Sequence, residues 1–266
     1  MRNTKASEPL RYDRRSLLGL AAATGMGAAM AQPAGPGTGT GTGTGGAGQP
    51  PAAAALTAKQ LAIGPIAATM AVGEMAALHT ALQRGLDAGL TVEETKEILV
   101  QLYAYAGFPR SLNALGALMQ VLEQRRQRGI QDAPGRLPGP VPAGAALLEA
   151  GTANQTRLAG APVRGPLFDF APAIDQFLKT HLFGDIFARD HLDWPSRELA
   201  TVAALAALAG VESQLGAHIR ISLNVGLTAA QLAQFGQALA QAGLGEAGAR
   251  VQVALDRHLQ ALRPAP

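Results

Sequence analysis

The chain has 266 residues, of which 48% are hydrophobic but only 4% are aromatic, and it contains no cysteine. This length is enough to bury a sizeable core. The lack of cysteine excludes disulfides, zinc–thiolate sites, iron–sulfur clusters and thiol catalysis. The formal net charge is +3, but residues 1–31 hold five basic and two acidic residues, and the remaining 17 basic and 17 acidic residues cancel. No basic patch is left to bind phosphates, so we expect no nucleic-acid partner.

Residues 1–31 show the order of features of a twin-arginine signal peptide. The run Asp13-Arg14-Arg15-Ser16-Leu17-Leu18 leads into an uncharged stretch that ends in the small-x-small sequence Ala29-Met30-Ala31. The apolar run is too short, and too rich in glycine and alanine, for a transmembrane helix. A disordered alanine-rich tail with an incidental arginine pair is the alternative. The pattern predicts a periplasmic protein that is exported already folded, with no stable membrane insertion after cleavage.

Residues 32–56 are of low complexity. Residues 35–48 hold eight glycines in a Gly-Thr alternation, which Pro50-Pro51 ends. Such a segment cannot recover its backbone entropy by burial, so we expect a flexible, disordered linker. The lysine and the strand–helix context of a phosphate-binding loop are missing.

From Thr57 onward the apolar residues recur with a period of 3.6, and alternating Val, Ile and Thr runs are missing. The fold class is therefore all-α. Two segments, 88–94 and 225–231, repeat the same punctuation, in which a glycine ends one helix and a capping box starts the next. These residues are Gly89, Thr91 and Glu94 in the first segment and Gly226, Thr228 and Gln231 in the second.

This punctuation favours an internal duplication, although two unrelated helical hairpins would also show it. The first repeat would span residues 57–130 and the second residues 191–262. Residues 131–190 between them are rich in Pro and Gly, and we expect a connection with short helices.

Several stretches resemble the carboxymuconolactone decarboxylase family. They are 102–113 (LYAYAGFPRSLN), 196–205 (SRELATVAAL), Glu212, His218-Ile219-Arg220 and 224–228 (NVGLT). The resemblance covers roughly residues 60–128 and 190–262. It implies a duplicated bundle of helical hairpins of the alkylhydroperoxidase D-like type, assembled as a homotrimer or homohexamer.

The peroxidase branch of this family uses a Cys-x-x-Cys pair ahead of a histidine, with a glutamate further upstream. Glu198 and His218 match that glutamate and that histidine, whereas Val211 and Gln214 stand at the cysteine positions. Thiol peroxidase activity is therefore rejected, although the family often carries that label.

Glu198 and His218 are the expected catalytic residues. They lie on successive predicted helices, and a carboxylate that faces an imidazole fixes its tautomer and favours its protonated form, which suits acid–base catalysis. The alternative is a structural pair that closes a buried polar gap. His79 is the expected counterpart in the first repeat, where Lys59 stands in place of Glu198, and a surface or packing role for His79 is equally open.

Arg110, Tyr103 and His79 are the expected substrate-binding residues. Arg110 follows Pro109 at a predicted helix start, where free backbone N–H groups also attract an anion. Arg197 and Arg220 are weaker candidates for the same role, and for each arginine a solvated side chain is the alternative. Tyr103 and Tyr105 could instead line a helix interface. The spacing of the histidines fits no metal site, so we expect no metal and no cofactor.

The resemblance implies cofactor-free decarboxylation or isomerisation of a small anionic lactone or ring-derived carboxylic acid. In this hypothesis His218 donates the proton, Glu198 orients His218, and Arg110 holds the carboxylate. Aromatic acids are ordinarily degraded inside the cell, so export argues against the simplest form of this hypothesis. The alternative is a non-catalytic helical binding or scaffold module of the same fold.

Overall fold

The computed structural model describes residues 55–263 of the chain. All regular elements in this range are helices, so the all-α prediction is confirmed. The predicted signal peptide (1–31) and most of the predicted linker (32–56) lie outside the described residues. Within the described range, no helix has both the length and the apolar character needed to cross a bilayer.

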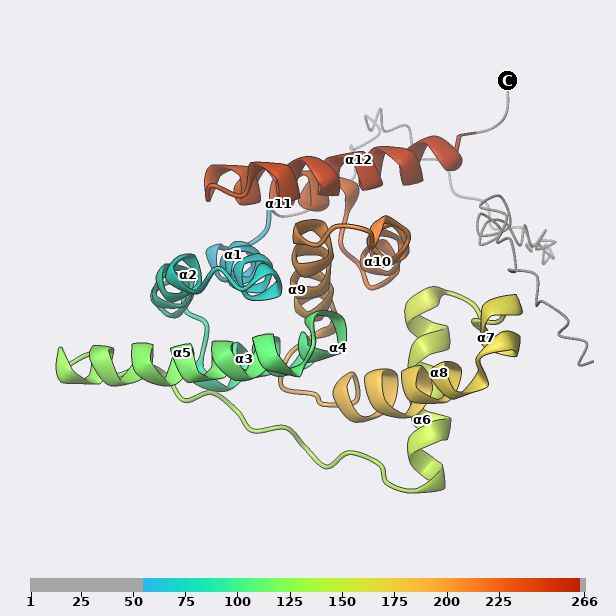
Figure 1. Cartoon of the computed structure of the whole chain (residues 1–266), viewed down its shortest axis with the longest axis horizontal. Helices are drawn as coiled ribbons and strands as arrows, with labels where there is room; N and C mark the ends of the chain where they lie inside the picture. Colours follow the sequence, from blue (N-terminus) through green and yellow to red (C-terminus); the bar gives the residue numbers. More distant parts are fainter. Residues whose placement is uncertain (1–54, 264–266) are drawn as a thin grey trace, which may run out of the picture. The chain divides into compact units, whose positions relative to one another are not determined.

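Helices α1 to α5 precede a connecting region, and helices α9 to α12 follow it (Figure 1). The first group consists of α1 (Ala58–Val72), α2 (Met75–Asp87), α3 (Val92–Gln101), α4 (Tyr103–Ala106) and α5 (Phe108–Gln127). The connecting region holds α6 (Ala145–Ala159), α7 (Pro166–Phe170), α8 (Pro172–Phe177) and the π-helical segment η1 (Leu178–Ile186). The last group consists of α9 (Trp194–Ala207), α10 (Glu212–Asn224), α11 (Ala229–Gln241) and α12 (Gly245–Ala261).

The main core forms where α1 packs along α9 (Figure 1). Both helices bury alanines completely, among them Ala67 and Ala68 of α1 and Ala203 and Ala204 of α9. Small side chains allow the helices to approach closely. At Gly64, an added Cβ atom would lie only 2.9 Å from the side-chain ends of Phe235 and Leu239 of α11, so a larger residue would require these side chains to shift.

The two predicted capping boxes are confirmed. Thr91 Oγ1 accepts the Glu94 backbone N–H at 3.2 Å, and the Glu94 carboxylate accepts the Thr91 backbone N–H at 2.9 Å. Thr228 and Gln231 form the same two bonds, also at 3.2 and 2.9 Å. The glycine two residues before each threonine has a φ of 95° or 102°, which favours glycine over other residues. The helix boundaries inferred from this punctuation are therefore correct.

Three helices of the second group follow three helices of the first group at one constant sequence offset. Helices α2, α3 and α5 begin at Met75, Val92 and Phe108, and helices α10, α11 and α12 begin at Glu212, Ala229 and Gly245. Each helix of the second set therefore begins 137 residues after its counterpart in the first set. For α1 and α9 the offset is one residue shorter. A duplicated helical unit would have this order and spacing. The spacing supports the internal repeat, which stays a prediction.

The connecting region is more regular than a run of short helices. α6 has 15 residues, and η1 is a π-helix of 9 residues. A Cβ atom added at Gly151 of α6 would lie 1.7 Å from the Lys179 carbonyl oxygen of η1, so the two helices touch backbone to backbone. Their contact supports a second, smaller core around Leu158 and Phe187.

Candidate active site

Glu198 and His218 meet where α9 packs against α10. Asp193 accepts the Ser196 backbone N–H at 2.7 Å and thereby caps α9, so that Glu198 lies in the second turn of this helix. Glu198 Oε2 lies 2.7 Å from His218 Nδ1. The Glu198 side chain is fully buried, and 10% of the His218 side-chain surface is exposed. The contact expected from the sequence is thus present.

The geometry of this pair determines which imidazole nitrogen is free. An ionised carboxylate can only accept hydrogen bonds, so the His218 proton that faces Glu198 is on Nδ1. Nε2 then carries the lone pair in neutral imidazole and an N–H in the cation. It forms no hydrogen bond with any residue between 55 and 263. An oriented and unoccupied nitrogen of this kind is what acid–base catalysis requires.

The other oxygen of the carboxylate is also unoccupied. Glu198 Oε1 is buried and has no hydrogen-bond partner within the described part of the chain. Leaving a buried acceptor unsatisfied costs about 1–3 kcal/mol, so native proteins keep few such atoms, and each of them calls for an explanation. A functional role for the pair would explain this one.

Tyr105 of α4 closes the site on one side. Its ring packs edge-on against the His218 ring, with centroids 5.4 Å apart and planes at 80°. The hydroxyl oxygen is buried. Burial raises the pKa of Tyr105, and the nearby Glu198 charge raises it further. The tyrosine therefore stays neutral beside the carboxylate and keeps its hydroxyl proton.

A second buried polar cluster joins α3 to α9 next to this pair. Glu97 accepts hydrogen bonds from Arg197 Nη2 at 2.8 Å and from Arg189 Nε at 2.9 Å. The Arg197 side chain is completely buried. The two sequence-based alternatives for Arg197, a substrate-binding or a solvated arginine, are therefore both wrong. Arg197 is an internal cation whose charge Glu97 balances.

Gln101 extends this cluster along α9. Arg197 Nη1 donates to Gln101 Oε1 at 2.9 Å, and Gln101 Nε2 donates to Thr201 Oγ1 at 2.9 Å. These bonds hold α9 against α3. Because Glu198 follows Arg197 directly, they also fix the position of Glu198. Neither Glu97 nor Gln101 was predicted from the sequence. The available signal was two polar residues one turn apart on a helix that also carries Ile98 and Leu99.

His191 belongs to the same cluster. Its Nε2 lies 3.0 Å from Glu97 Oε2, and its buried Nδ1 has no hydrogen-bond partner among residues 55–263. Burial lowers the pKa of His191; Glu97 opposes this effect, and the charges of Arg189 and Arg197 add to it. A neutral His191 completes the cluster without adding a third cation.

The structure brings none of the three expected substrate-binding residues into contact with the pair. Arg110 is partly buried in the first turn of α5 and forms no hydrogen bond or ion pair with a described residue. Tyr103 stacks on Phe108, with ring centroids 4.2 Å apart. His79 Nε2 lies 3.2 Å from Gln120 Oε1, in a groove between α2 and α5.

The principal grooves in the described range are lined by neither Glu198 nor His218. Among residues 55–263, the pair opens to the surface through the exposed tenth of the His218 side chain. The described residues also contain no group of three or more His, Asp or Glu side chains placed to hold a metal ion.

Comparison with known proteins supports one assignment. The family model described as Carboxymuconolactone decarboxylase family matches residues 172–256, a range that includes both Glu198 and His218. A search of curated proteins found no match. The chain therefore carries a carboxymuconolactone decarboxylase family domain, in a sequence without cysteine.

Proposed function

We propose that the chain is a carboxymuconolactone decarboxylase-like enzyme that needs no cofactor. Its substrate would be a small anionic lactone or another ring-derived carboxylic acid, which it decarboxylates or isomerises by acid–base chemistry. The buried contact between Glu198 Oε2 and His218 Nδ1 carries this proposal, because it leaves His218 Nε2 oriented and unoccupied.

In the decarboxylation, the bond between the substrate carbon and its carboxylate breaks and CO2 leaves. The electron pair moves into the conjugated carbonyl of the lactone, so the substrate itself serves as the electron sink. His218 donates its Nε2 proton to form the new C–H bond, and solvent returns a proton to the imidazole. Glu198 holds the ring in the required orientation and stabilises the imidazolium.

Arg110 is the proposed anion-binding residue. It has no partner within the described residues, and it lies in the first turn of a helix of 20 residues, where backbone N–H groups also favour an anion. A guanidinium can bind a carboxylate through two parallel hydrogen bonds. Tyr103 and His79 contribute to substrate binding in the same proposal.

The test is a reaction of the purified chain with a panel of carboxylated lactones in D2O. We expect CO2 release, and one deuterium on the product carbon that lost the carboxylate, because the proton on His218 exchanges with solvent. The same lactones in buffer alone give the background rate. CO2 release at the background rate across the panel would contradict the proposal.

A non-catalytic binding or scaffold module of the same fold is the second proposal. The observation that favours it is the burial of the pair, which none of the principal grooves in the described range reaches. In that case the pair only stabilises the bundle, and His218→Ala lowers the melting temperature without changing ligand binding by the folded protein.

We also propose periplasmic localisation by the twin-arginine route. Residues 13–18 and 29–31 support it through their sequence alone. Replacing Arg14 and Arg15 together by lysine should trap the uncleaved protein in the cytoplasm. Periplasmic protein that still begins at Met1, as measured by mass spectrometry, would argue against cleavage at this site.

A homo-oligomer, trimeric or hexameric, is the proposed assembly. Large apolar side chains lie exposed on α5, α7 and α8, with Phe108 at 61%, Phe170 at 82% and Phe177 at 62%. Exposed apolar side chains in this number are typical of protein interfaces. Light scattering that gives a monomer mass at micromolar concentration would contradict the proposal.

A further inference from the structure

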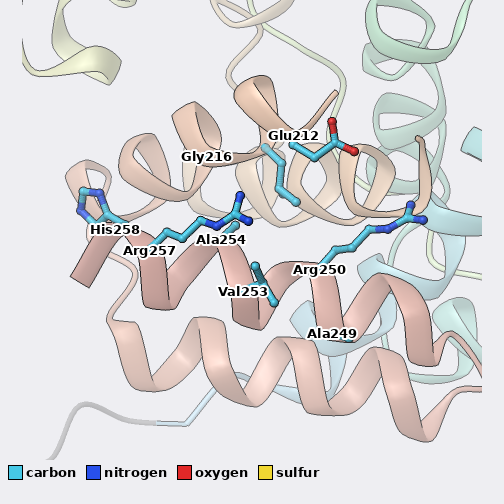
Figure 2. A pocket seen from close by; sticks show the side chains of 9 residues that line it. Glu212, Gly216, Ala249, Arg250, Val253, Ala254, Arg257 and His258 are labelled. Carbon is cyan, nitrogen blue, oxygen red and sulfur yellow. The ribbon is translucent and has the colours of Figure 1, made fainter. Parts of the chain in front are cut away.

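A groove runs between α10 and α12, away from the pair (Figure 2). Its volume is about 370 Å³, at the small end of the range of ligand pockets. It is lined by Glu212, Leu215, Gly216, Ala249, Arg250, Val253, Ala254, Arg257 and His258. Residues from Arg250 to Arg257 span two helical turns, so the groove is about 10 Å long.

The groove combines an apolar surface with a free guanidinium. Leu215 is buried beneath it, whereas Val253 remains 48% exposed. Figure 2 shows the Arg257 side chain lying along the groove. Arg257 forms no hydrogen bond or ion pair with any residue between 55 and 263. An apolar wall with an unpaired guanidinium beside it matches an amphipathic anion.

The second arginine is already engaged. Arg250 Nη1 donates to the carbonyl oxygens of Ala206 and Leu208 at 3.2 and 3.1 Å, and Arg250 Nη2 lies 3.6 Å from Glu246 Oε2. It therefore satisfies the C-terminal end of α9. This leaves Arg257, with His258 next to it in the sequence, as the anion-binding residue of the groove.

Glu212 is the one acidic residue among the described residues that line the groove. Its carboxylate accepts the Gly210 backbone N–H at 3.2 Å. Hydrogen bonds from the backbone lower the pKa of Glu212, and the charges of Arg250 and Arg257 lower it further. Glu212 stays ionised, so an anionic ligand would place its charged head near Arg257 and its apolar part over Val253.

The first group of helices forms a groove at corresponding positions but without these cations. The groove lies between α2 and α5, and most of its lining residues correspond to lining residues of the α10–α12 groove at the offset shared by these helices. Asn113 corresponds to Arg250, and Gln120 corresponds to Arg257. Two neutral amides in one groove thus replace two guanidinium groups in the other.

We propose that the α10–α12 groove binds a small monocarboxylate with an apolar chain, with the carboxylate on Arg257 and the chain over Leu215 and Val253. One free guanidinium favours one anionic group over two. The length and volume of the groove fit a medium-length acyl chain. This site is separate from Glu198 and His218, so the proposal does not depend on the proposed reaction.

The probe is octanoate, titrated into the full chain by isothermal titration calorimetry, with octanol as the uncharged control. We expect saturable binding of octanoate and about tenfold weaker binding of octanol, which cannot form a charge-assisted hydrogen bond with Arg257. Octanoate that shows no saturable binding, or octanol that binds equally well, would overturn the proposal.

The variant Arg257→Gln gives the α10–α12 groove the residue found at the corresponding position of the α2–α5 groove. It should bind octanoate about tenfold more weakly, with an unchanged circular dichroism spectrum. Adding Gln241→Arg, an exposed position outside the groove, restores the net charge without restoring the site. Recovery of affinity in that double variant would show non-specific attraction and would overturn the proposal.

Discussion

The two halves of the helical chain share their helix order, spacing and capping boxes but differ in what they bury at corresponding positions. In the second half, Glu198 Oε2 and His218 Nδ1 lie 2.7 Å apart. Counted from the helix starts, the corresponding residues of the first half are Ala62 and Ala81. Both of these pack in or against the main core. The sequence analysis placed Lys59 opposite Glu198. Counted from the helix starts, the residue that corresponds to Glu198 is instead Ala62.

This difference shows where the chemistry of the fold can lie. Apolar atoms fill the position in the first half at no electrostatic cost, whereas a buried pair of polar side chains must overcome the loss of its hydration. Keeping such a pair in one half only is consistent with a role beyond packing. His79 is not its counterpart, because it lies in the α2–α5 groove and corresponds to Gly216.

The largest expected effect separates the two histidines. His218→Ala should lower any turnover by about 10²–10⁴-fold, the usual contribution of a positioned acid–base group. His79→Ala, a change at the histidine of the α2–α5 groove, should raise KM but leave kcat within about twofold, since the proposal gives His79 a role in substrate binding and none in proton transfer. Rates per folded molecule test this, and equal losses in both variants would remove the distinction between the halves.

A second comparison concerns stability. Glu97→Ala should destabilise the protein by about 3–5 kcal/mol, because it leaves the buried Arg197 without its counter-charge. The residue at the corresponding position is Gln234, whose side chain accepts the Leu56 backbone N–H at 2.9 Å. Gln234→Ala should cost only about 1 kcal/mol. Urea unfolding measures both, and similar losses would show that the Glu97 cluster is no more important than one hydrogen bond.

His191 should make this cluster sensitive to pH. Because burial lowers its pKa, the unfolded chain binds a proton more readily than the folded one. The stability due to neutral His191 is therefore complete above about pH 6.5 and is lost as the pH falls below that value, by at most about 1.4 kcal/mol per pH unit. Between pH 7.5 and 5.5, wild-type protein should lose more stability than His191→Gln. Parallel losses in the two proteins would contradict this.

The smallest effects should be equal in the two halves. Thr91→Ala and Thr228→Ala each remove the side chain of a capping box and should each cost about 1 kcal/mol. Thermal unfolding of the two variants measures this. A large difference between them would show that the two boxes, although alike in geometry, stabilise different parts of the chain.

Local signals explain what could be predicted from the sequence. Gly89 and Thr91 determine a helix end and a helix start by their own backbone and side-chain preferences, so the boundaries were correct. The contact of Glu198 with His218 was also expected, although it depended on the family resemblance as well as on the spacing. The α2–α5 and α10–α12 grooves were not predicted, because each is formed by two helices that do not follow each other directly in the chain.

Long-range pairing explains what could not be predicted. Arg197 binds Glu97, which lies far away in the sequence on α3, and no local pattern shows which carboxylate a buried arginine will meet. The π-helical turns of η1 were also missed; this segment packs against α6, where Gly151 lies close to the Lys179 carbonyl. Both features lie at contacts between elements that the sequence alone does not place together.

The most direct test of the central claim is a double-mutant cycle on Glu198 and His218, read as CO2 release per folded molecule. If the two act as a unit, Glu198→Gln should cost less than His218→Ala, because the amide still bonds to Nδ1 but can donate as well as accept and no longer fixes the tautomer. The double variant should then be hardly slower than His218→Ala alone. Losses that multiply, or a normal rate per folded molecule in His218→Ala, would contradict the account.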